Sequence, residues 1–145
     1  NLANAYARLG MHKEAITNYN KAIELKPVFG EAILNLAIEL SVSGFEQEAF
    51  KKFEEAVDLM PKNPDALFNY GIACAKKGDY NRALINMEKA AALRPDNPQI
   101  HYNIGLVYLR LEMKKKAVEE FRKVLQINPS HKEAQLQLNR INSVF

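Results

Sequence analysis

The residues of this 145-residue protein best suited to chemistry are side-chain amides at a constant spacing. They lie 34 residues apart, at Asn1, Asn35, Asn69 and Asn103, and Gln137 continues the series. Each amide offers both a hydrogen-bond donor and an acceptor, so it can pair with the backbone carbonyl and N–H groups of a bound polypeptide. Such contacts ignore the ligand's side chains. The series predicts a ladder that recognises peptide backbone.

Two apolar columns with the same spacing accompany the amides. One column directly precedes them, at Leu34, Phe68, Tyr102 and Leu136, and the other follows three residues later, at Ile38, Ile72 and Leu106. We expect both columns to form apolar pockets that select alternate hydrophobic side chains. Asn4 joins this predicted groove, and Arg8, Lys76 and Arg110 form its polar margin. The alternative is that the apolar residues pack against a neighbouring helix and that Asn serves packing alone.

Other kinds of chemistry find little support in the sequence. The three histidines, His12, His101 and His131, fall at different positions of the pattern and form no cluster at metal-ligand spacing. His101 and Cys74 fall on core columns, where we expect a packed imidazole and a buried thiol. Each glycine falls at a turn, a close helix contact or the start of a unit, so no phosphate-binding loop is present. We therefore predict no enzyme active site, no metal and no cofactor.

A repeat of paired helices would place these amides in one row. Small residues recur every 34 positions at Ala15, Ala49, Ala83 and Ala117, and at Ala3, Ala37, Gly71 and Gly105, while prolines recur at Pro27, Pro61, Pro95 and Pro129. The second helix of each unit has apolar residues on one face and ends before its proline. Between the two helices, Gly10, Gly44 and Gly78 supply a left-handed residue. Glu112 stands there in the fourth unit, so we expect that turn to be strained or differently shaped.

Composition and charge limit the classes of protein. The sequence is 48% hydrophobic and 26% charged, which is typical of a folded domain, and its single cysteine cannot form an internal disulfide. No apolar run is long enough to span a membrane. Residues 1–72 carry 7 basic and 10 acidic side chains and residues 73–145 carry 13 and 7, so the two ends should differ in charge. Basic residues 114–116 favour a solvated helix end over an anion site, and without interleaved stacking aromatics no nucleic-acid partner is expected.

This pattern of small, aromatic and proline columns resembles the tetratricopeptide repeat family over essentially the whole sequence. The resemblance implies an all-α solenoid, a right-handed superhelix with a concave groove. We divide this single array, residues 1–145, into units at 1–29, 30–63, 64–97 and 98–131, followed by a capping helix at 132–145. The first unit lacks its start, and Asn1 should fall inside a first helix. The last helix should open with a capping box from Ser130 to Glu133 and bury one stripe, Ala134, Leu138, Ile141 and Phe145, beside the polar row Gln135, Asn139 and Asn142.

The family resemblance implies binding of extended peptides or helices on the concave surface. The Asn series is similar to the asparagine ladder of the O-linked N-acetylglucosamine transferase superhelix. A second family precedent, the carboxylate clamp for chaperone tails, requires a Lys and an Arg where this protein has Asp65 and Asn69, so we expect no such role.

The function expected is therefore a noncatalytic scaffold that binds a partner polypeptide in its groove. The alternatives are the substrate-recognition arm of a larger enzyme, such as a glycosyltransferase, and a scaffold that self-assembles through its N-terminal face. The sequence does not begin with Met and has no leader pattern, so we expect a fragment with residues upstream. The expected location is the cytoplasm.

Overall fold

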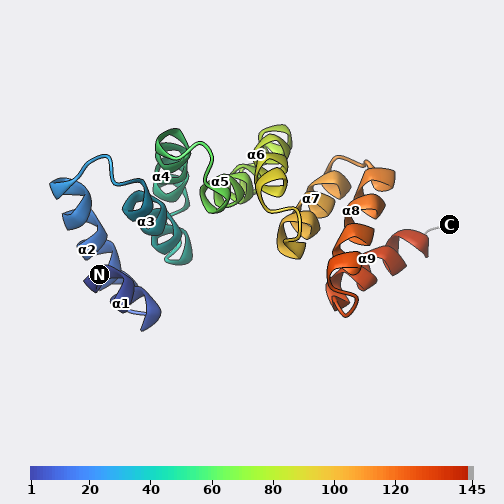
Figure 1. Cartoon of the computed structure of the whole chain (residues 1–145), viewed down its shortest axis with the longest axis horizontal. Coiled ribbons are helices and arrows are strands. Elements are labelled where there is room, and N and C mark those ends of the chain that lie inside the picture. The colour runs from blue at the N-terminus through green and yellow to red at the C-terminus, as the bar shows by residue number, and fades with distance from the viewer. Residues whose placement is uncertain (144–145) are drawn as a thin grey trace.

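The helices of this protein follow one another in antiparallel pairs that stack into an arch (Figure 1). The computed structural model describes residues 1–143 and has no strand there. Its nine described helices are α1 (Leu2–Arg8), α2 (His12–Leu25), α3 (Gly30–Val42), α4 (Glu46–Leu59), α5 (Pro64–Lys76), α6 (Tyr80–Leu93), α7 (Pro98–Arg110), α8 (Lys114–Ile127) and α9 (Lys132–Asn142). In the described part of the protein, no helix is long and apolar enough to cross a bilayer.

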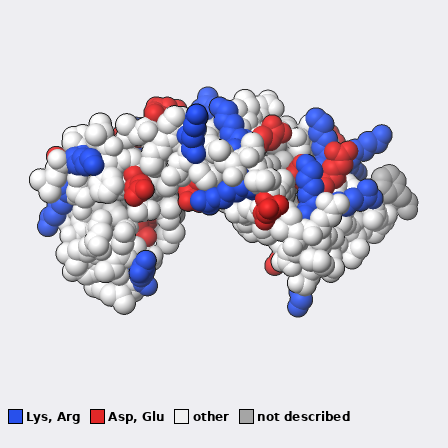
Figure 2. Space-filling model, in the orientation of Figure 1, with Lys and Arg blue, Asp and Glu red and all other residues white. Residues whose placement is uncertain are grey.

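Each helix packs chiefly on its neighbours in the sequence. The pairs α1–α2, α3–α4, α5–α6 and α7–α8 are the closest associations, and each second helix also packs on the first helix of the next pair. The space-filling view shows the resulting arch with a recess between its two limbs (Figure 2). The prediction of an all-α solenoid is confirmed. The helix pairs α3–α4, α5–α6 and α7–α8 fall within residues 30–63, 64–97 and 98–131.

The turn inside each helix pair has the same geometry in all four units. Gly10, Gly44 and Gly78 have φ values of 72°, 89° and 84°, as predicted for a left-handed residue. Glu112 has φ 59°, so it adopts the same conformation without being glycine. Its turn closes with the same hydrogen bond, because Met113 N donates to Tyr108 O at 2.9 Å where Phe45 N donates to Leu40 O at 2.8 Å. The fourth turn was expected to be strained or differently shaped, and the first alternative is the one found: the shape is kept, and the strain lies in the positive φ of Glu112.

The small-residue column lets the two helices of a pair approach closely. A Cβ atom built on Gly105 would lie 2.6 Å from Phe121 Cε1, and one on Gly71 would lie 2.7 Å from Met87 Cγ. Ala3 and Ala37 hold the same position in the first two units and are 1% and 0% exposed. A larger residue there would force the second helix away, which explains why the column contains only Ala and Gly.

The polar residues predicted to lie in the core are buried. His101 places Nδ1 2.8 Å from Glu120 Oε2 and Nε2 2.8 Å from the carbonyl oxygen of Pro95. Both ring nitrogens of His101 therefore have a polar neighbour within hydrogen-bond distance, so the buried imidazole is not left without partners. Cys74 is fully buried, and this burial raises the pKa of its thiol, so the reactive thiolate is disfavoured.

The prediction that Ser130 caps the last helix is wrong. At the other end, Asn1 directly precedes α1, and its side chain accepts a hydrogen bond from Ala3 N at 2.9 Å. At α9 the capping residue is His131, whose Nδ1 accepts from Ala134 N, whereas Ser130 donates to the side chain of Asn128. The helix therefore begins one residue later than a Ser130 cap requires.

The buried stripe of α9 can be followed as far as the structure describes it. Ala134 is fully buried, Ile141 is 8% exposed and Leu138 packs partly on the core. Gln135, Asn139 and Asn142 are exposed, as expected of the polar row. Phe145, the last residue of the predicted stripe, lies outside the described residues.

Replacing Glu112 by Gly should stabilise the protein. A side chain in the left-handed region costs about 1–2 kcal/mol, while glycine loses about 0.5–1 kcal/mol in backbone entropy on folding. We therefore expect the free energy of unfolding, measured by urea denaturation, to rise by about 0.5–1 kcal/mol. The reverse change, Gly78→Ala, should lower it by a similar amount, because a Cβ at Gly78 meets nothing within 4 Å and only the dihedral angle is strained. A loss of stability in Glu112→Gly would contradict this account.

Replacing Gly105 by Ala should destabilise the protein despite the better helix propensity of alanine. The added Cβ overlaps a fully buried aromatic ring, and overpacking of this kind costs about 1–3 kcal/mol. Thermal unfolding followed by circular dichroism should show a lower Tm. The matched variant is Gly30→Ala, where the Cβ meets only the flexible, partly exposed side chain of Met60. Equal effects of the two substitutions would show that ring overlap is not the cause.

Candidate functional site

Three hollows follow one another along the first helices of the units. The N-terminal hollow lies between α1 and α3, the middle hollow between α3 and α5, and the C-terminal hollow between α5 and α7. Their volumes are about 270, 160 and 420 Å³ respectively. We call this row of hollows the groove.

The same repeat positions line each hollow. One amide of the predicted ladder lies in each, in the order Asn35, Asn69 and Asn103. The second helix contributes Tyr19, Phe53 and Met87 in the same order, and a small residue of the preceding first helix adds Ala7, Ser41 and Ala75. The 34-residue period of the sequence is thus also the period of the hollows.

The ladder amides are partly engaged with their own helices. Asn69 Nδ2 donates to the carbonyl oxygen of Asp65 at 2.8 Å, and Asn103 Nδ2 donates to that of Gln99 at 2.8 Å. An amide nitrogen carries two hydrogens and its oxygen accepts, so each of these residues keeps one donor and its acceptor for other partners. All three amides of the groove are half-buried. The side chain of Asn35 makes no hydrogen bond to another residue within 1–143.

The N-terminal hollow is the polar one. Asn4 accepts a hydrogen bond from the Tyr19 hydroxyl, and burial, with the negative charge of Glu39, raises the pKa of Tyr19. Glu39 is itself buried, with Oε2 2.6 Å from His12 Nδ1. Arg8 adds a cation to the lining. These groups already satisfy one another in part, so this hollow offers polar contacts and little apolar surface.

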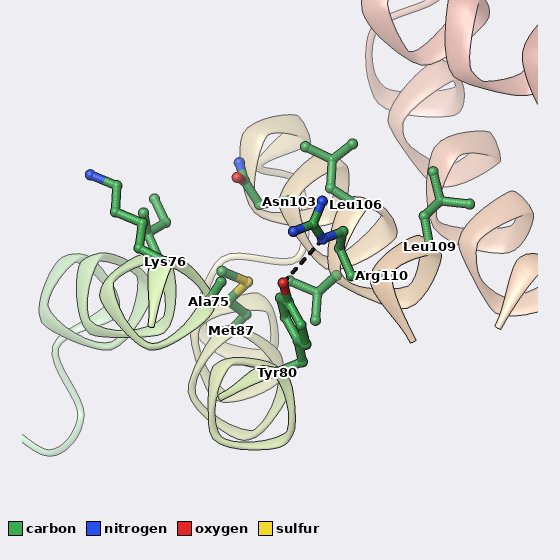
Figure 3. Close-up of a pocket in the computed structure, with 10 residues that line it drawn as sticks. Ala75, Lys76, Tyr80, Met87, Asn103, Leu106, Leu109 and Arg110 are labelled. Atoms are coloured by element: carbon green, nitrogen blue, oxygen red, sulfur yellow. Dashed lines mark hydrogen bonds between the residues drawn. The ribbon is translucent and has the colours of Figure 1, made fainter. Parts of the chain in front are cut away.

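The C-terminal hollow has apolar walls and cations at its margin (Figure 3). Met87, Leu106 and Leu109 line it, and the Arg110 and Tyr80 side chains meet beside Leu106. Arg110 Nε donates to the Tyr80 hydroxyl at 3.0 Å. On the opposite side Lys76 Nζ lies 3.5 Å from Glu46 Oε1, in an exposed ion pair that holds it weakly.

Several predicted site residues lie together in the groove. Asn4, Asn35, Ile38, Asn69, Ile72, Lys76, Asn103, Leu106 and Arg110 line one or two of the hollows. Asn1 and the column that directly precedes the amides do not line any of them. The amides and the residues three positions later are therefore the part of the predicted site that the fold gathers.

Three of the four residues in the column that precedes the amides pack against other elements, and Leu136 on α9 is the exception. Leu34 is only 6% exposed, so its prediction as an accessible pocket residue is wrong. The Tyr102 ring packs at a tilt against the rings of Phe121 and His131, with centroids 5.7 and 5.2 Å away. Each residue of a helix turns about 100° from the last, so this position faces the packed units when the amide faces the groove. Phe68 is half-buried against the core, and on α9 Leu136 is 48% exposed and Gln137 half-buried.

The second helices contribute to the hollows in a way that the repeat pattern does not predict. Tyr19, Phe53 and Met87 lie on the apolar face of these helices, and each is at most 4% exposed. They nevertheless form the floors of the three hollows. Tyr80, at the start of α6, had no signal in the repeat, because Glu46 and Lys114 occupy its position in the neighbouring units.

The basic side chains of the C-terminal half are spread over its surface and alternate with acidic ones (Figure 2). Lys114, Lys115 and Arg122 line a shallow depression between α8 and α9 together with Glu119. Lys116 lies with its Nζ 5.6 Å from the centroid of the Tyr108 ring. Among residues 1–143, no three His, Cys, Asp or Glu side chains are grouped closely enough to hold a metal ion.

Comparisons with known proteins identify the repeat. Models described as tetratricopeptide repeat match residues 1–29, 98–131 and 52–85, and one described as TPR repeat matches residues 71–112. Together these matches span well over half of the sequence. No curated protein sequence is similar enough to count as a relative.

Solved structures share the whole architecture. MamA from Desulfovibrio magneticus is 23% identical with a TM-score of 0.91, and the match covers 98% of this protein and 80% of that one. A Pseudomonas aeruginosa PilF structure is 25% identical with a TM-score of 0.86, covering 97% of this protein and 64% of that one. A subunit in the structure of the APC/C hetero-tetramer Cut9–Hcn1 is 22% identical with a TM-score of 0.86, covering 97% of this protein and 28% of that one.

The geometry of the amides predicts that they are dispensable for folding. Asn69 and Asn103 each make one hydrogen bond, to a carbonyl that is already part of a helix. Because alanine exceeds asparagine in helix propensity by about 0.5 kcal/mol, changing Asn35, Asn69 and Asn103 together to Ala should leave stability unchanged or raise it by up to about 1.5 kcal/mol. Urea denaturation measures this. A loss of more than about 1 kcal/mol would assign the amides a structural role.

Proposed function

Because this protein belongs to the tetratricopeptide repeat family, we propose that it is a noncatalytic scaffold that binds an extended segment of a partner protein in the groove. The observation that carries this proposal is the recurrence of the hollows. Three surfaces of related composition lie in a row, and each has one partly unpaired amide. A polypeptide in extended conformation is the ligand that presents equivalent groups at regular intervals along its length.

The spacing of the hollows suits an extended backbone. Neighbouring first helices in packed helical arrays lie about 10 Å apart, and an extended polypeptide advances about 3.3 Å per residue. Successive ladder amides would therefore meet roughly every third residue of the ligand. The remaining N–H and the Oδ1 atom of each amide can pair with the ligand's C=O and N–H, respectively. Backbone pairing would supply affinity, and the hollows would supply selectivity.

We propose self-association of the sequence as given as a second candidate, through the N-terminal face of α1. Leu2 on α1 is 59% exposed, whereas Leu36, Tyr70 and Ile104 at the same repeat position are at most 6% exposed under the preceding unit. A second copy could cover this surface as a preceding unit would. Sedimentation at increasing concentration should then show dimers in the original protein and monomers in Leu2→Lys.

Peptide selection tests the groove directly. A random peptide library displayed on phage is selected against the original protein and against the variant with Asn35, Asn69 and Asn103 changed to Ala. We expect the original protein to enrich apolar-patterned peptides and the variant to bind them at least ten-fold more weakly, since three pairs of backbone hydrogen bonds are lost. Thr17→Ala with Asn18→Ala on α2 is a control, because these side chains bond only within their own helix. Unchanged affinity in the triple variant would remove the ladder from the binding surface.

A further inference from the structure

The three hollows differ from one another in size and polarity. The C-terminal hollow, at about 420 Å³, lies within the range of about 300–1,000 Å³ that is usual for ligand pockets, whereas the middle hollow, at about 160 Å³, lies below it. The N-terminal hollow is lined by the polar groups of Asn4, Tyr19 and Glu39. An extended ligand would therefore meet a different selection at each position along the groove.

Substitutions at equivalent positions explain the size difference. The floor of the C-terminal hollow is Met87, where the middle hollow has the aromatic ring of Phe53. The side wall has Lys76 and Ala75 in place of Val42 and Ser41. Methionine is flexible and polarisable, so it adapts to bulky apolar groups of several shapes. The C-terminal hollow thus combines room with an adaptable floor.

The margin of the same hollow carries two cations, one without a carboxylate partner among the described residues and one in a long, exposed ion pair. Arg110 hydrogen bonds to the neutral Tyr80 hydroxyl, and over residues 1–143 no carboxylate lies within salt-bridge distance of its guanidinium. Lys76 is 53% exposed at the side chain and pairs with Glu46 only at 3.5 Å. Arg110 and Lys76 come from the last turns of α7 and α5 and lie on different sides of the apolar walls (Figure 3). A carboxylate beside a bulky apolar group would complement this arrangement.

We propose that the C-terminal hollow selects a bulky apolar side chain of the partner with an acidic residue directly next to it. This inference rests on the proposed function, because the C-terminal hollow can select a side chain only if the groove binds a peptide. The acidic residue pairs with Arg110 and Lys76 while the apolar side chain lies against Met87 and Leu106. About three residues along the ligand, the middle hollow admits only a small side chain. The register of the ligand is therefore fixed by its single bulky residue.

The test uses three variants. One fills the C-terminal hollow, one makes the equivalent substitution in the N-terminal hollow, and one removes the two positive charges at the margin. Ala75→Phe places a ring in the C-terminal hollow, whereas Ala7→Phe places one in the N-terminal hollow at the same repeat position. Arg110→Gln with Lys76→Gln removes the charge without changing the shape greatly. Circular dichroism and thermal unfolding of each variant confirm that it folds. If Ala75→Phe does not fold, the Arg110→Gln, Lys76→Gln variant still tests the proposal.

Peptides enriched by the original protein are then measured by fluorescence anisotropy. We expect them to carry Leu, Met, Phe or Ile adjacent to Asp or Glu, and we expect Ala75→Phe to weaken binding at least ten-fold and by a larger factor than Ala7→Phe does. Replacing the ligand's bulky residue by Ala should weaken binding to the original protein but not to Ala75→Phe. Replacing its acidic residue by the amide should weaken binding to the original protein but not to the Arg110→Gln, Lys76→Gln variant.

The outcomes separate this inference from the function on which it rests. If the original protein enriches no peptide, the proposed function fails and this selectivity fails with it. If peptides bind in a manner that needs the Asn ladder but show no apolar and acidic pair, the scaffold function stands and the selectivity is overturned. Equal weakening by Ala75→Phe and Ala7→Phe would overturn it as well, because the C-terminal hollow would then have no special part in binding.

Discussion

The close approach of the two helices in each unit is the constraint on which the rest of this fold relies. At Gly71 and Gly105 there is no room for a Cβ atom beside Met87 and Phe121, and Ala3 and Ala37 hold the same contact in the first two units. Protein interiors are packed to crystal density, so such a contact tolerates little variation in volume. Its recurrence every 34 residues makes the units nearly identical in shape, and identical units stack into a regular array.

The groove is a consequence of that regularity. Because the units repeat, the space between successive first helices repeats too, and the same positions line it each time. The side chains that line the hollows differ between units, because packing restricts these positions less than it restricts the small-residue column. Tyr19, Phe53 and Met87 all fill the floor position, yet they leave hollows that differ in volume and polarity. A rigid scaffold with variable linings is a general solution for binding diverse partners, since stability and selectivity are then assigned to different residues.

Two histidine–carboxylate pairs interrupt the repetition. His101 Nδ1 lies 2.8 Å from Glu120 Oε2, at a repeat position where the preceding units have the apolar residues Leu67 and Ile33. His12 Nδ1 lies 2.6 Å from Glu39 Oε2 beside the N-terminal hollow. A buried pair such as His101–Glu120 contributes little net stability over apolar residues of similar volume, because desolvation offsets the attraction. Both histidine–carboxylate pairs do fix local geometry. The His12–Glu39 pair also helps to make the N-terminal hollow polar, because Glu39 lines it.

The period, the helix pairs, the buried small-residue columns and the left-handed turns could all be predicted from the sequence, because each depends on local backbone geometry and on spacing between residues. The amides that the hollows share could be identified in the same way. The sequence did not indicate that Leu34 is buried while Asn35 lines the groove, that Tyr102 packs against His131, or that Met87 forms a floor as well as a core contact. A repeat shows which residues are equivalent, but the rotation of each helix against its neighbours decides which of two adjacent residues faces the open surface. That rotation follows from how all the side chains pack together, so it is fixed only in the folded molecule.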